Sequence, residues 1–461
     1  MNWGDVLTAM LPENILLAGI LLLLVAEIAS GRKRDGFVIA FVTVALAAGG
    51  ACMLFADGYS AAPFLGHFSV STATSLPKAA ILALTLPVIL MSRDDFAETG
   101  FHVLLLSSLY GACLMISSDS FLTLFLGLEL MSLPVYVLVL LAFLRPESTE
   151  AALKYLVLGG AATATFLMGA SLLYGWGGSL ALTAFQSSLS ALQPMAVAGA
   201  ILVVIALMLK AAIVPFHAWA PDAYEGASVP VTAYMATVVK AAVLLAALRL
   251  FGDALMTRPM ADMLAVLPLV SMVWGNLAAI RQTSFRRMIA YSSIAHAGYL
   301  FYALLGAGPG RYEAVTFYLV VYGVMNVLAF AALPRSVDDA RHDQLDALKG
   351  LFHRQPFAAI LISAAMLSLA GLPPLPGFVG KFLIFRNVLA AGYTTYAVLG
   401  LVASYLGIYF YLRVIQYMFM SAEEPSAVHG RPRRLAFVAS LLCLVPAILL
   451  SVFPGWLLDR L

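Results

Sequence analysis

Long apolar runs, separated by short polar segments, follow one another along almost the whole chain. A helix needs about 20 predominantly apolar residues to cross a bilayer. Such runs cover residues 12–30, 37–56, 73–92, 99–117, 120–143, 151–175, 195–219, 227–251, 261–280, 285–306, 312–333, 357–390, 393–420 and 434–453. They are too continuous for the strands of a membrane barrel, which alternate over roughly 9–11 residues. The pattern predicts an all-α polytopic membrane protein with about 14 transmembrane helices.

The segments between these runs are short, so residues 1–461 are predicted to form a single membrane domain. The stretch 181–192, "ALTAFQSSLSAL", is too short and polar to span, and we expect a small helix on the membrane surface. The N-terminal stretch has no Lys or Arg before its apolar core and carries Asp5 and Glu13. A cleaved signal peptide normally begins with positive charge, so we interpret this stretch as a retained first helix.

The composition supports a membrane location. The chain of 461 residues is 62% hydrophobic and only 11% charged, whereas a soluble domain has about 25% charged residues. Cys52, Cys113 and Cys443 lie far apart in apolar runs, so we expect neither a disulfide framework nor a metal site. The sequence has no Walker A loop, no strand-associated GxGxxG and no HExxH. We therefore expect no cofactor, no metal and no nucleic acid partner for this chain.

Basic residues are divided unevenly between alternate loops, and cytoplasmic loops are the ones that collect Lys and Arg. The termini and the loops after even-numbered runs hold three, namely Arg258, Arg311 and Arg460. We therefore predict that the loops after odd-numbered runs face the cytoplasm, or the mitochondrial matrix, and that both termini lie on the other side of the membrane. The fifteen basic residues of the odd loops are Arg32, Lys33, Arg34, Arg93, Arg145, Arg281, Arg286, Arg287, Arg335, Arg341, Lys349, Arg354, Arg431, Arg433 and Arg434.

Four charged residues lie well inside the apolar runs: Lys210, Lys240, Lys381 and Glu129. Each charge costs roughly 2.5–3.5 kcal/mol at a helix centre, and the four together cost on the order of 10 kcal/mol unless they are paired or hydrated. Ion pairs that hold helices together are one explanation. Three lysines cannot all be neutralised by one glutamate, however. Some of them are therefore predicted to line a water-filled path or to be neutral part of the time.

Other basic residues lie near helix ends. We expect the long side chains of Lys78 and Arg249 to extend to the membrane interface. Lys154 follows Glu150 by four residues, the order that favours an ion pair on a helix. It is kept as a secondary candidate for the site.

Helix-breaking residues accompany two of the buried lysines. Pro215 follows Lys210, and a group consisting of Pro373, Pro374, Pro376 and Gly377 precedes Lys381. Irregular backbone at membrane depth persists only where protein or water satisfies it. Two interrupted helices in corresponding places are typical of inverted-repeat transporters. We predict broken helices 7 and 12 and two inverted five-helix repeats, 99–251 (helices 4–8) and 261–420 (helices 9–13).

Two histidines are secondary candidates. His217 follows Pro215, and His296 lies in the middle of "MIAYSSIAHAGYLFYALL" among hydroxyl-bearing residues. A lone histidine in such a helix usually does no more than form a hydrogen bond to a neighbouring helix. At membrane depth among hydroxyls, a proton relay is the other interpretation.

Four motifs resemble the antiporter-like membrane subunits of respiratory complex I, an NADH:quinone oxidoreductase. They are "GLELMSLPVYVL", "LKAAIVPFHAWAPDAYEGASVPVTAYMATVVKAA", "RQTSFRRMIAYSSIAHAGYL" and "AGLPPLPGFVGKF". The resemblance covers more than half of the chain and is best to the subunit N (ND-two) type. It implies a proton path in which Glu129 is the helix-5 carboxylate, Lys210 its helix-7 partner, Lys240 the connecting lysine of helix 8, and Lys381 the lysine of broken helix 12.

The same resemblance implies that NADH, FMN, iron–sulfur clusters and quinone belong to partner subunits, and that this chain adjoins other membrane subunits in the lipid bilayer. Two alternatives stay open. One is a subunit of a multi-subunit cation/proton antiporter or of a membrane-bound hydrogenase. The other is a structural spacer that pumps nothing.

Overall fold

The computed structural model of the chain describes residues 3–30, 36–96, 99–141, 146–254, 256–306, 308–334, 344–421 and 434–461. The predicted apolar runs form helices, because a helix satisfies every backbone N–H and C=O within its own segment. The chain divides into two units. Unit 1 comprises Met1–Ile89, Phe96–Ala212 and Val238–Met263, and unit 2 comprises Leu90–Asp95, Ile213–Thr237 and Leu264–Leu461.

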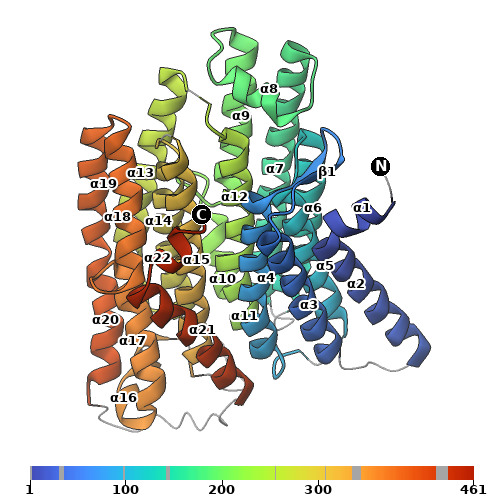
Figure 1. Cartoon of the computed structure of the whole chain (residues 1–461). Coiled ribbons are helices and arrows are strands. Elements are labelled where there is room, and N and C mark those ends of the chain that lie inside the picture. Colours follow the sequence, from blue (N-terminus) through green and yellow to red (C-terminus); the bar gives the residue numbers. More distant parts are fainter. Residues whose placement is uncertain are drawn as a thin grey trace. The chain divides into compact units, whose positions relative to one another are not determined.

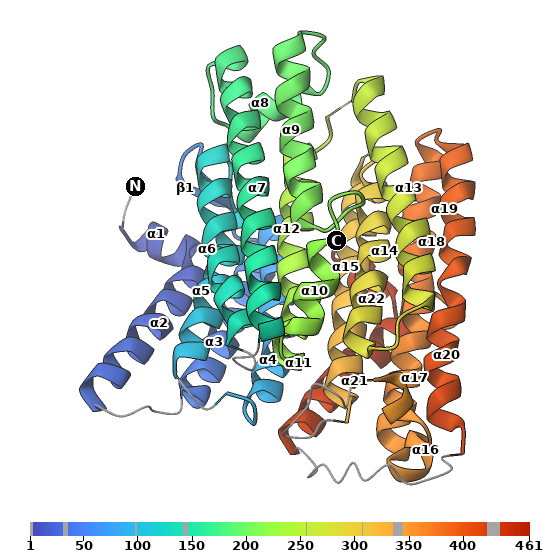
Figure 2. The same cartoon turned by 180° about the vertical axis from the view of Figure 1, so that it is seen from behind.

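Unit 1 consists mainly of long helices. Its elements are α1 (Trp3–Ala9), α2 (Leu11–Ser30), α3 (Phe37–Ala56), β1 (Ala61–Phe64), β2 (Phe68–Val70), α4 (Thr72–Ser92), α5 (Thr99–Ile116), α6 (Phe121–Leu140), α7 (Pro146–Gly177), α8 (Leu182–Ser188), α9 (Pro194–Lys210) and α12 (Lys240–Phe251). Helices α5, α6, α7 and α9 pack in that order, and the row from α6 to α9 is easily followed in Figure 2. The short α8 lies within the predicted surface segment 181–192.

Small residues allow these helices to approach closely, as is common in membrane proteins. A Cβ atom added to Gly111 of α5 would lie 2.3 Å from the backbone nitrogen of Met131 in α6. A Cβ added to Gly169 of α7 would lie 2.8 Å from the carbonyl oxygen of Gly199 in α9. The backbones of both helix pairs are therefore in direct contact.

An antiparallel hairpin connects α3 with α4. Strands β1 and β2 pair Ala61 with Val70 and Phe64 with Phe68, around a turn in which Gly66 has a φ of +75°. Phe68 and Val70 belong to a buried apolar cluster with Ala9 and Leu54. The hairpin thus fixes the start of α4 against α1 and α3.

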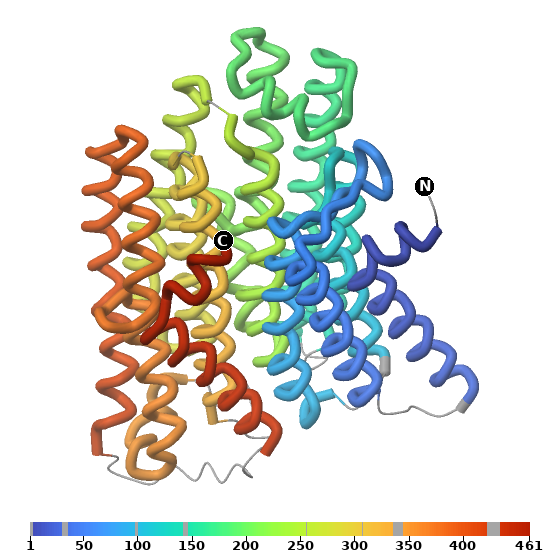
Figure 3. Tube along the Cα trace, in the orientation of Figure 1, coloured from blue at the N-terminus to red at the C-terminus, as the bar shows by residue number. Residues whose placement is uncertain are grey.

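Unit 2 contains the second interrupted helix. Its elements are α10 (Trp219–Gly226), α11 (Val229–Tyr234), the π-helix η1 (Met235–Val239), α13 (Arg258–Ile280), α14 (Phe285–Ala303), α15 (Pro309–Ala332), the 3-10 helix η2 (Leu345–Leu348), α16 (Leu351–Arg354), α17 (Pro356–Ala370), α18 (Pro376–Ala390), α19 (Thr394–Leu406), α20 (Ile408–Phe419), α21 (Arg434–Val452) and α22 (Gly455–Leu458). Figure 1 shows α17 beside α20 and α18 beside α19. In the tube of Figure 3, the red α21 runs obliquely to the other helices of this unit, among them α15, against which it packs.

The first interruption follows Lys210 directly. Ala212 has a φ of +62°, unusual for a residue with a side chain, and a cis peptide bond joins Val214 to Pro215. The Val214 N–H donates to the Ser271 hydroxyl at 2.7 Å, so this buried backbone group is satisfied by a side chain. The helix resumes at Trp219 as α10.

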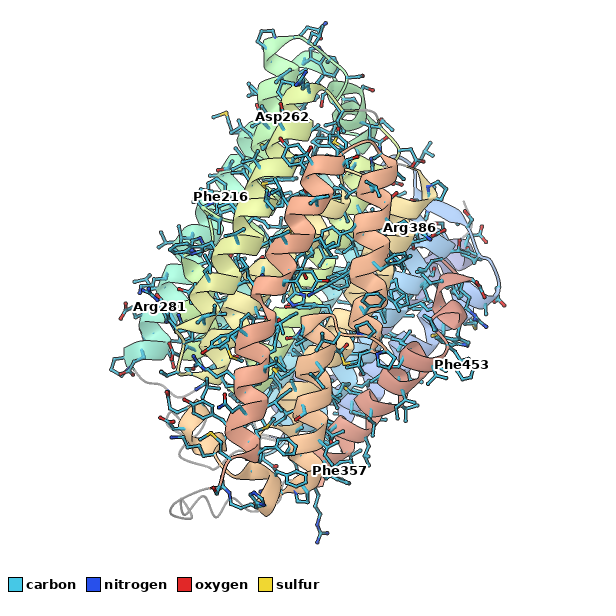
Figure 4. All side chains as sticks on the ribbon, turned by 90° about the vertical axis from the view of Figure 1, so that its left-hand side faces the viewer. Phe216, Asp262, Arg281, Phe357, Arg386 and Phe453 are labelled. Atoms are coloured by element: carbon cyan, nitrogen blue, oxygen red, sulfur yellow. The ribbon has the colours of Figure 1, made fainter. Side chains whose placement is uncertain are left out.

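The second interruption separates α17 from α18. The N–H of Gly371 donates to Ser368 C=O at 2.9 Å and that of Leu372 to Leu367 C=O at 3.1 Å, with a Gly371 φ of +85°. This is the pairing of a Schellman motif, which ends a helix. The peptide bond between Pro373 and Pro374 is cis. Figure 4 shows Phe357, at the start of α17, and Arg386, near the end of α18, at opposite ends of the broken span.

The predicted broken helices 7 and 12 are confirmed, and each of the fourteen predicted runs contains a helix. In the described ranges, ten helices are long and apolar enough to cross a membrane, and three shorter apolar helices correspond to the runs at 99–117, 195–219 and 357–390. One boundary differs markedly from the prediction. The run at 195–219 ends its first helix at Lys210, and residues 220–226, predicted to lie between two runs, belong to α10. Asp222 and Glu225 are charged, so a search for long apolar runs does not identify this helix.

Several basic residues used to predict orientation lie outside the described residues. They are Arg32, Lys33, Arg34, Arg145, Arg335, Arg341, Arg431 and Arg433.

Candidate functional site

Glu129 and Lys210 come together inside unit 1. Glu129 lies in the middle of α6, and Lys210 is the last residue of α9. Glu129 Oε1 is 3.6 Å from Lys210 Nζ. The lysine side chain is 4% exposed and that of the glutamate 22%, so only the carboxylate has an open side.

Hydroxyl groups complete the surroundings of this pair. Lys210 Nζ donates to Ser132 Oγ at 3.3 Å and to the Tyr136 hydroxyl at 3.2 Å. The Thr163 hydroxyl of α7 donates to Glu129 Oε1. An ammonium has three N–H donors, and here they face two hydroxyls and one carboxylate. Hydroxyls donate as well as accept, so they can form a hydrogen bond with either a charged or a neutral lysine.

The helical spacing of α6 explains this arrangement. Ser132 and Tyr136 follow Glu129 by three and seven residues, so all three lie on one face of the helix. Sequence reasoning selected Glu129 and missed its two neighbours, although this spacing could have identified them. Thr163 had no comparable signal.

Lys240 is the first residue of α12 and is buried. It follows η1, and π-helical turns often occur at functional positions. Helix α12 packs against α9, which ends at Lys210. A relay from Lys240 to residues of unit 2 stays a prediction.

Lys381 is enclosed at the second interruption. Its Nζ donates to the carbonyl of Ala370 at 2.9 Å and to Ser404 Oγ at 3.1 Å. It lies 4.9 Å from the centre of the Tyr299 ring. The Ala370 carbonyl is one of the last four of α17, which lack a partner within the helix. Ser404 and Tyr299 were not predicted.

The two histidines occupy different settings. His217, between α9 and α10, accepts a hydrogen bond at Nε2 from Trp274 Nε1 at 2.9 Å. His296, in α14, is buried, with its two ring nitrogens next to the hydroxyls of Tyr411 and Tyr318. None of these aromatic partners was identified from the sequence.

Lys154 pairs with Glu150 at 2.6 Å, as the sequence spacing predicts. Both side chains are largely exposed, at 44% and 67%. The structure therefore does not bring Lys154 into the enclosed group around Lys210.

Two interpretations of basic residues were wrong. Lys78 does not extend to the interface: its side chain is 1% exposed and its Nζ lies 2.5 Å from Glu13 Oε1. Arg249 is likewise held inside unit 1 by Asp119 at 2.5 Å and by the Ser118 carbonyl at 2.8 Å. Both errors arose because a helix end was equated with the membrane surface, whereas the hairpin and the loop before α6 cover these ends.

Among the residues that the structure describes, no group of three or more His, Cys, Asp or Glu is placed to hold a metal ion.

The fold and these residues define a class: polytopic membrane proteins in which buried lysines lie at interrupted helices and a glutamate of a neighbouring helix pairs with one of them. The sequence model of one family, described as "NADH:quinone oxidoreductase/Mrp antiporter, TM", matches residues 118–407. The chain therefore belongs to this family, and the resemblance inferred from the motifs is confirmed.

Similar proteins narrow the relationship. The NADH-quinone oxidoreductase subunit N of Pelobacter propionicus is 40% identical over 420 residues, which cover 91% of this chain and 90% of that protein. A chain of respiratory complex I from Thermus thermophilus with bound aureothin is 35% identical, with a TM-score of 0.85, and the match covers 97% of this chain and 98% of that one. A chain of the Mrp complex from Dietzia sp. shares the fold, with a TM-score of 0.84, 22% identity and coverage of 98% and 96%.

Proposed function

We propose that this chain is a proton-translocating membrane subunit of an NADH:quinone oxidoreductase, of the subunit N type. The observation that carries the proposal is the enclosed pair Glu129–Lys210 at the first helix interruption, with its 3.6 Å separation and its hydroxyl neighbours. Most of the chain aligns with subunit N relatives, which supports this assignment.

The geometry supports a lysine that gains and loses a proton. Glu129 stabilises the charged ammonium of Lys210, and its side chain is the more exposed of the two. When Lys210 releases its proton, the hydroxyls of Ser132 and Tyr136 can turn and donate to the amine. In this proposal the hydroxyl shell accommodates both states of the lysine.

The remaining candidates take secondary parts in the same proposal. Lys240 connects Lys210 to the second half of the path, with His296 as an intermediate. Lys381 releases the proton to the other side of the membrane. His217 and Lys154 are auxiliary positions. The two interrupted helices belong to inverted repeats at 99–251 and 261–420.

The proposal also includes location and partners. The protein is multi-pass in the inner membrane of a bacterium, with both termini on the non-cytoplasmic side. It adjoins other membrane subunits. NADH, FMN, iron–sulfur clusters and quinone are bound by partner subunits, while this chain binds no cofactor.

The test uses the assembled complex carrying Lys210→Ala, Lys210→Arg or Glu129→Ala. Alanine removes the proton carrier, and arginine keeps a charge that it cannot release. Each variant should reduce both protons pumped per NADH and coupled NADH oxidation. Lys349→Ala is the control, since this lysine is 44% exposed and pairs with Asp346.

Assembly is checked on a native gel before pumping is measured. Wild-type pumping in well-assembled Lys210→Ala and Lys210→Arg complexes contradicts the proposal. Isolation of the chain with partners that do not oxidise NADH would instead favour a cation/proton antiporter.

A further inference from the structure

A group of hydroxyls surrounds His296 in unit 2. We call Ser292, His296, Tyr318 and Tyr411 the His296 cluster. Ser292 and His296 lie one turn apart on α14, Tyr318 lies on α15 and Tyr411 on α20. All four residues are buried, with 2% exposure or less. Polar groups this deeply buried are normally hydrogen-bonded, and here they bond one another.

The bonds form a continuous chain. His296 Nδ1 is 2.6 Å from the Tyr318 hydroxyl, and His296 Nε2 is 2.9 Å from the Tyr411 hydroxyl. The Tyr411 hydroxyl is in turn 2.5 Å from Ser292 Oγ. The order of groups is therefore Ser292, Tyr411, His296 and Tyr318.

A histidine between two hydroxyls has two equally satisfied arrangements. A neutral imidazole donates from one ring nitrogen and accepts at the other, whereas a hydroxyl does both. Tyr411 can donate to Nε2 while Nδ1–H donates to Tyr318, or every bond can point the other way. A carboxylate or a backbone carbonyl in place of either tyrosine would fix one tautomer, since neither group can donate.

The cluster lies next to a residue of the proposed path. Tyr299 follows His296 by three residues on α14, and the two ring centres are 5.5 Å apart. The Nζ atom of Lys381 in turn lies 4.9 Å from the centre of the Tyr299 ring. The hydroxyl chain itself contains no carboxylate, lysine or arginine, so it can pass a proton without binding one tightly.

We propose that Tyr411 and Tyr318 are proton-relay residues that act with His296 as a two-way proton wire, an inference that rests on the proposed function. An incoming proton binds the Tyr411 oxygen as the Tyr411 O–H proton moves to His296 Nε2. The Nδ1–H proton moves to the Tyr318 oxygen, and the original Tyr318 O–H proton leaves. Each group gains one proton and loses one, and every bond of the wire then points the other way, ready to pass a proton in the opposite direction.

The test replaces each hydroxyl separately in the assembled complex. Tyr411→Phe and Tyr318→Phe keep the rings and remove the relay oxygen. His296→Gln keeps a donor and an acceptor but provides no ring that can exchange tautomers. A positioned proton donor or acceptor contributes roughly 100-fold or more to a transfer rate. Each variant should therefore lower protons pumped per NADH and raise the solvent deuterium isotope effect on coupled NADH oxidation.

Two tyrosines serve as controls. Tyr302, on α14, is buried, and its hydroxyl has no hydrogen-bond partner among the described residues. Tyr409, two residues before Tyr411 on α20, is 60% exposed. Tyr302→Phe and Tyr409→Phe should pump like the wild type. If these controls also lose pumping, the reduced pumping of Tyr411→Phe and Tyr318→Phe is an effect of packing, and the relay proposal is wrong.

Lys210→Ala, measured alongside, separates this inference from the proposed function. If Lys210→Ala lowers pumping while Tyr411→Phe and Tyr318→Phe leave pumping and the isotope effect unchanged, the relay is wrong and the function stands. If all of them pump normally in assembled complexes, both are wrong.

Discussion

At the scale of single residues, two kinds of buried charge can be compared in this protein. Lys210 and Lys381 each have hydroxyl neighbours that can turn to suit a charged or a neutral amine. The pair Glu13–Lys78 has none: apart from each other, neither charged group has a hydrogen-bond partner among the described residues. Lysines with hydroxyl neighbours can therefore gain and lose a proton, whereas the Glu13–Lys78 pair is expected to stay a permanent ion pair.

The pair Glu13–Lys78 provides a prediction about assembly. Lys78→Met or Glu13→Gln alone leaves a buried, unpartnered polar or charged group, and breaking a buried pair costs about 3–5 kcal/mol. The double variant removes both charges, so it should be destabilised less than the sum of the two single variants. The measurement is the thermal stability and yield of the assembled complex, with pumping per NADH expected to be unchanged in the double variant.

A matched control is Lys154→Met. The pair of Lys154 with Glu150 is exposed and should contribute little to the stability of the complex. Additive losses in the double variant would show that Glu13 and Lys78 are not coupled.

At the scale of elements, the second interruption depends on a close approach between two backbones. A Cβ atom on Gly377 would lie 1.8 Å from the carbonyl oxygen of Ser368. The Gly377 N–H donates to Ser368 Oγ at 3.1 Å. The start of α18 is therefore in direct backbone contact with the end of α17. This contact fixes the position of Lys381, which follows Gly377 by one helical turn.

Gly377→Ala should accordingly separate α17 from α18. We expect poor assembly, or an assembled complex that pumps less because Lys381 is displaced. Gly160→Ala on α7 is the control: nothing lies within 4 Å of its added Cβ, and alanine in a helix is favoured over glycine by about 1 kcal/mol. Normal assembly and pumping in Gly377→Ala would show that the contact is not required.

The elements also show how far sequence reasoning reaches. Apolar run length located the long helices, and prolines located both interruptions, because both depend on local chemistry. The extent of α10 was missed, since its Asp222 and Glu225 are neutralised by Arg287, 65 and 62 residues away. The partners of His296 were missed for the same reason: Tyr411 lies 115 residues further along the chain. Such pairings depend on tertiary contacts that no local pattern encodes.

At the scale of the whole molecule, the family match and the candidate site coincide. Residues 118–407 include Glu129, Lys210, Lys240, His296 and Lys381. The Glu13–Lys78 pair and α21 lie outside this range. Transport chemistry is thus expected to reside mainly in the matched part, although Tyr411 of the proposed wire lies just beyond its end.

Lys381 tests whether the second interruption takes part in transport by the whole complex. Lys381→Ala removes a proton-binding group and should lower protons pumped per NADH. Lys381→Glu retains a group that binds a proton, so it should pump more than Lys381→Ala and less than the wild type. Pumping in membrane vesicles, after a check of assembly, provides the measurement. Full pumping in Lys381→Ala would leave the interruption with a structural role only.

The end of α17 also constrains how this sequence can evolve. Gly371 has a φ of +85°, and a Cβ there would lie 2.8 Å from Lys381 Cδ. Positive φ alone would tolerate asparagine or aspartate, but the lysine stem occupies the space that their side chains need. Any side chain at position 371 therefore competes for space with the stem of Lys381. A lineage that replaces Gly371 while keeping the lysine must move that stem, and the amine with it, so substitutions at the two positions are expected to be linked in its ancestry.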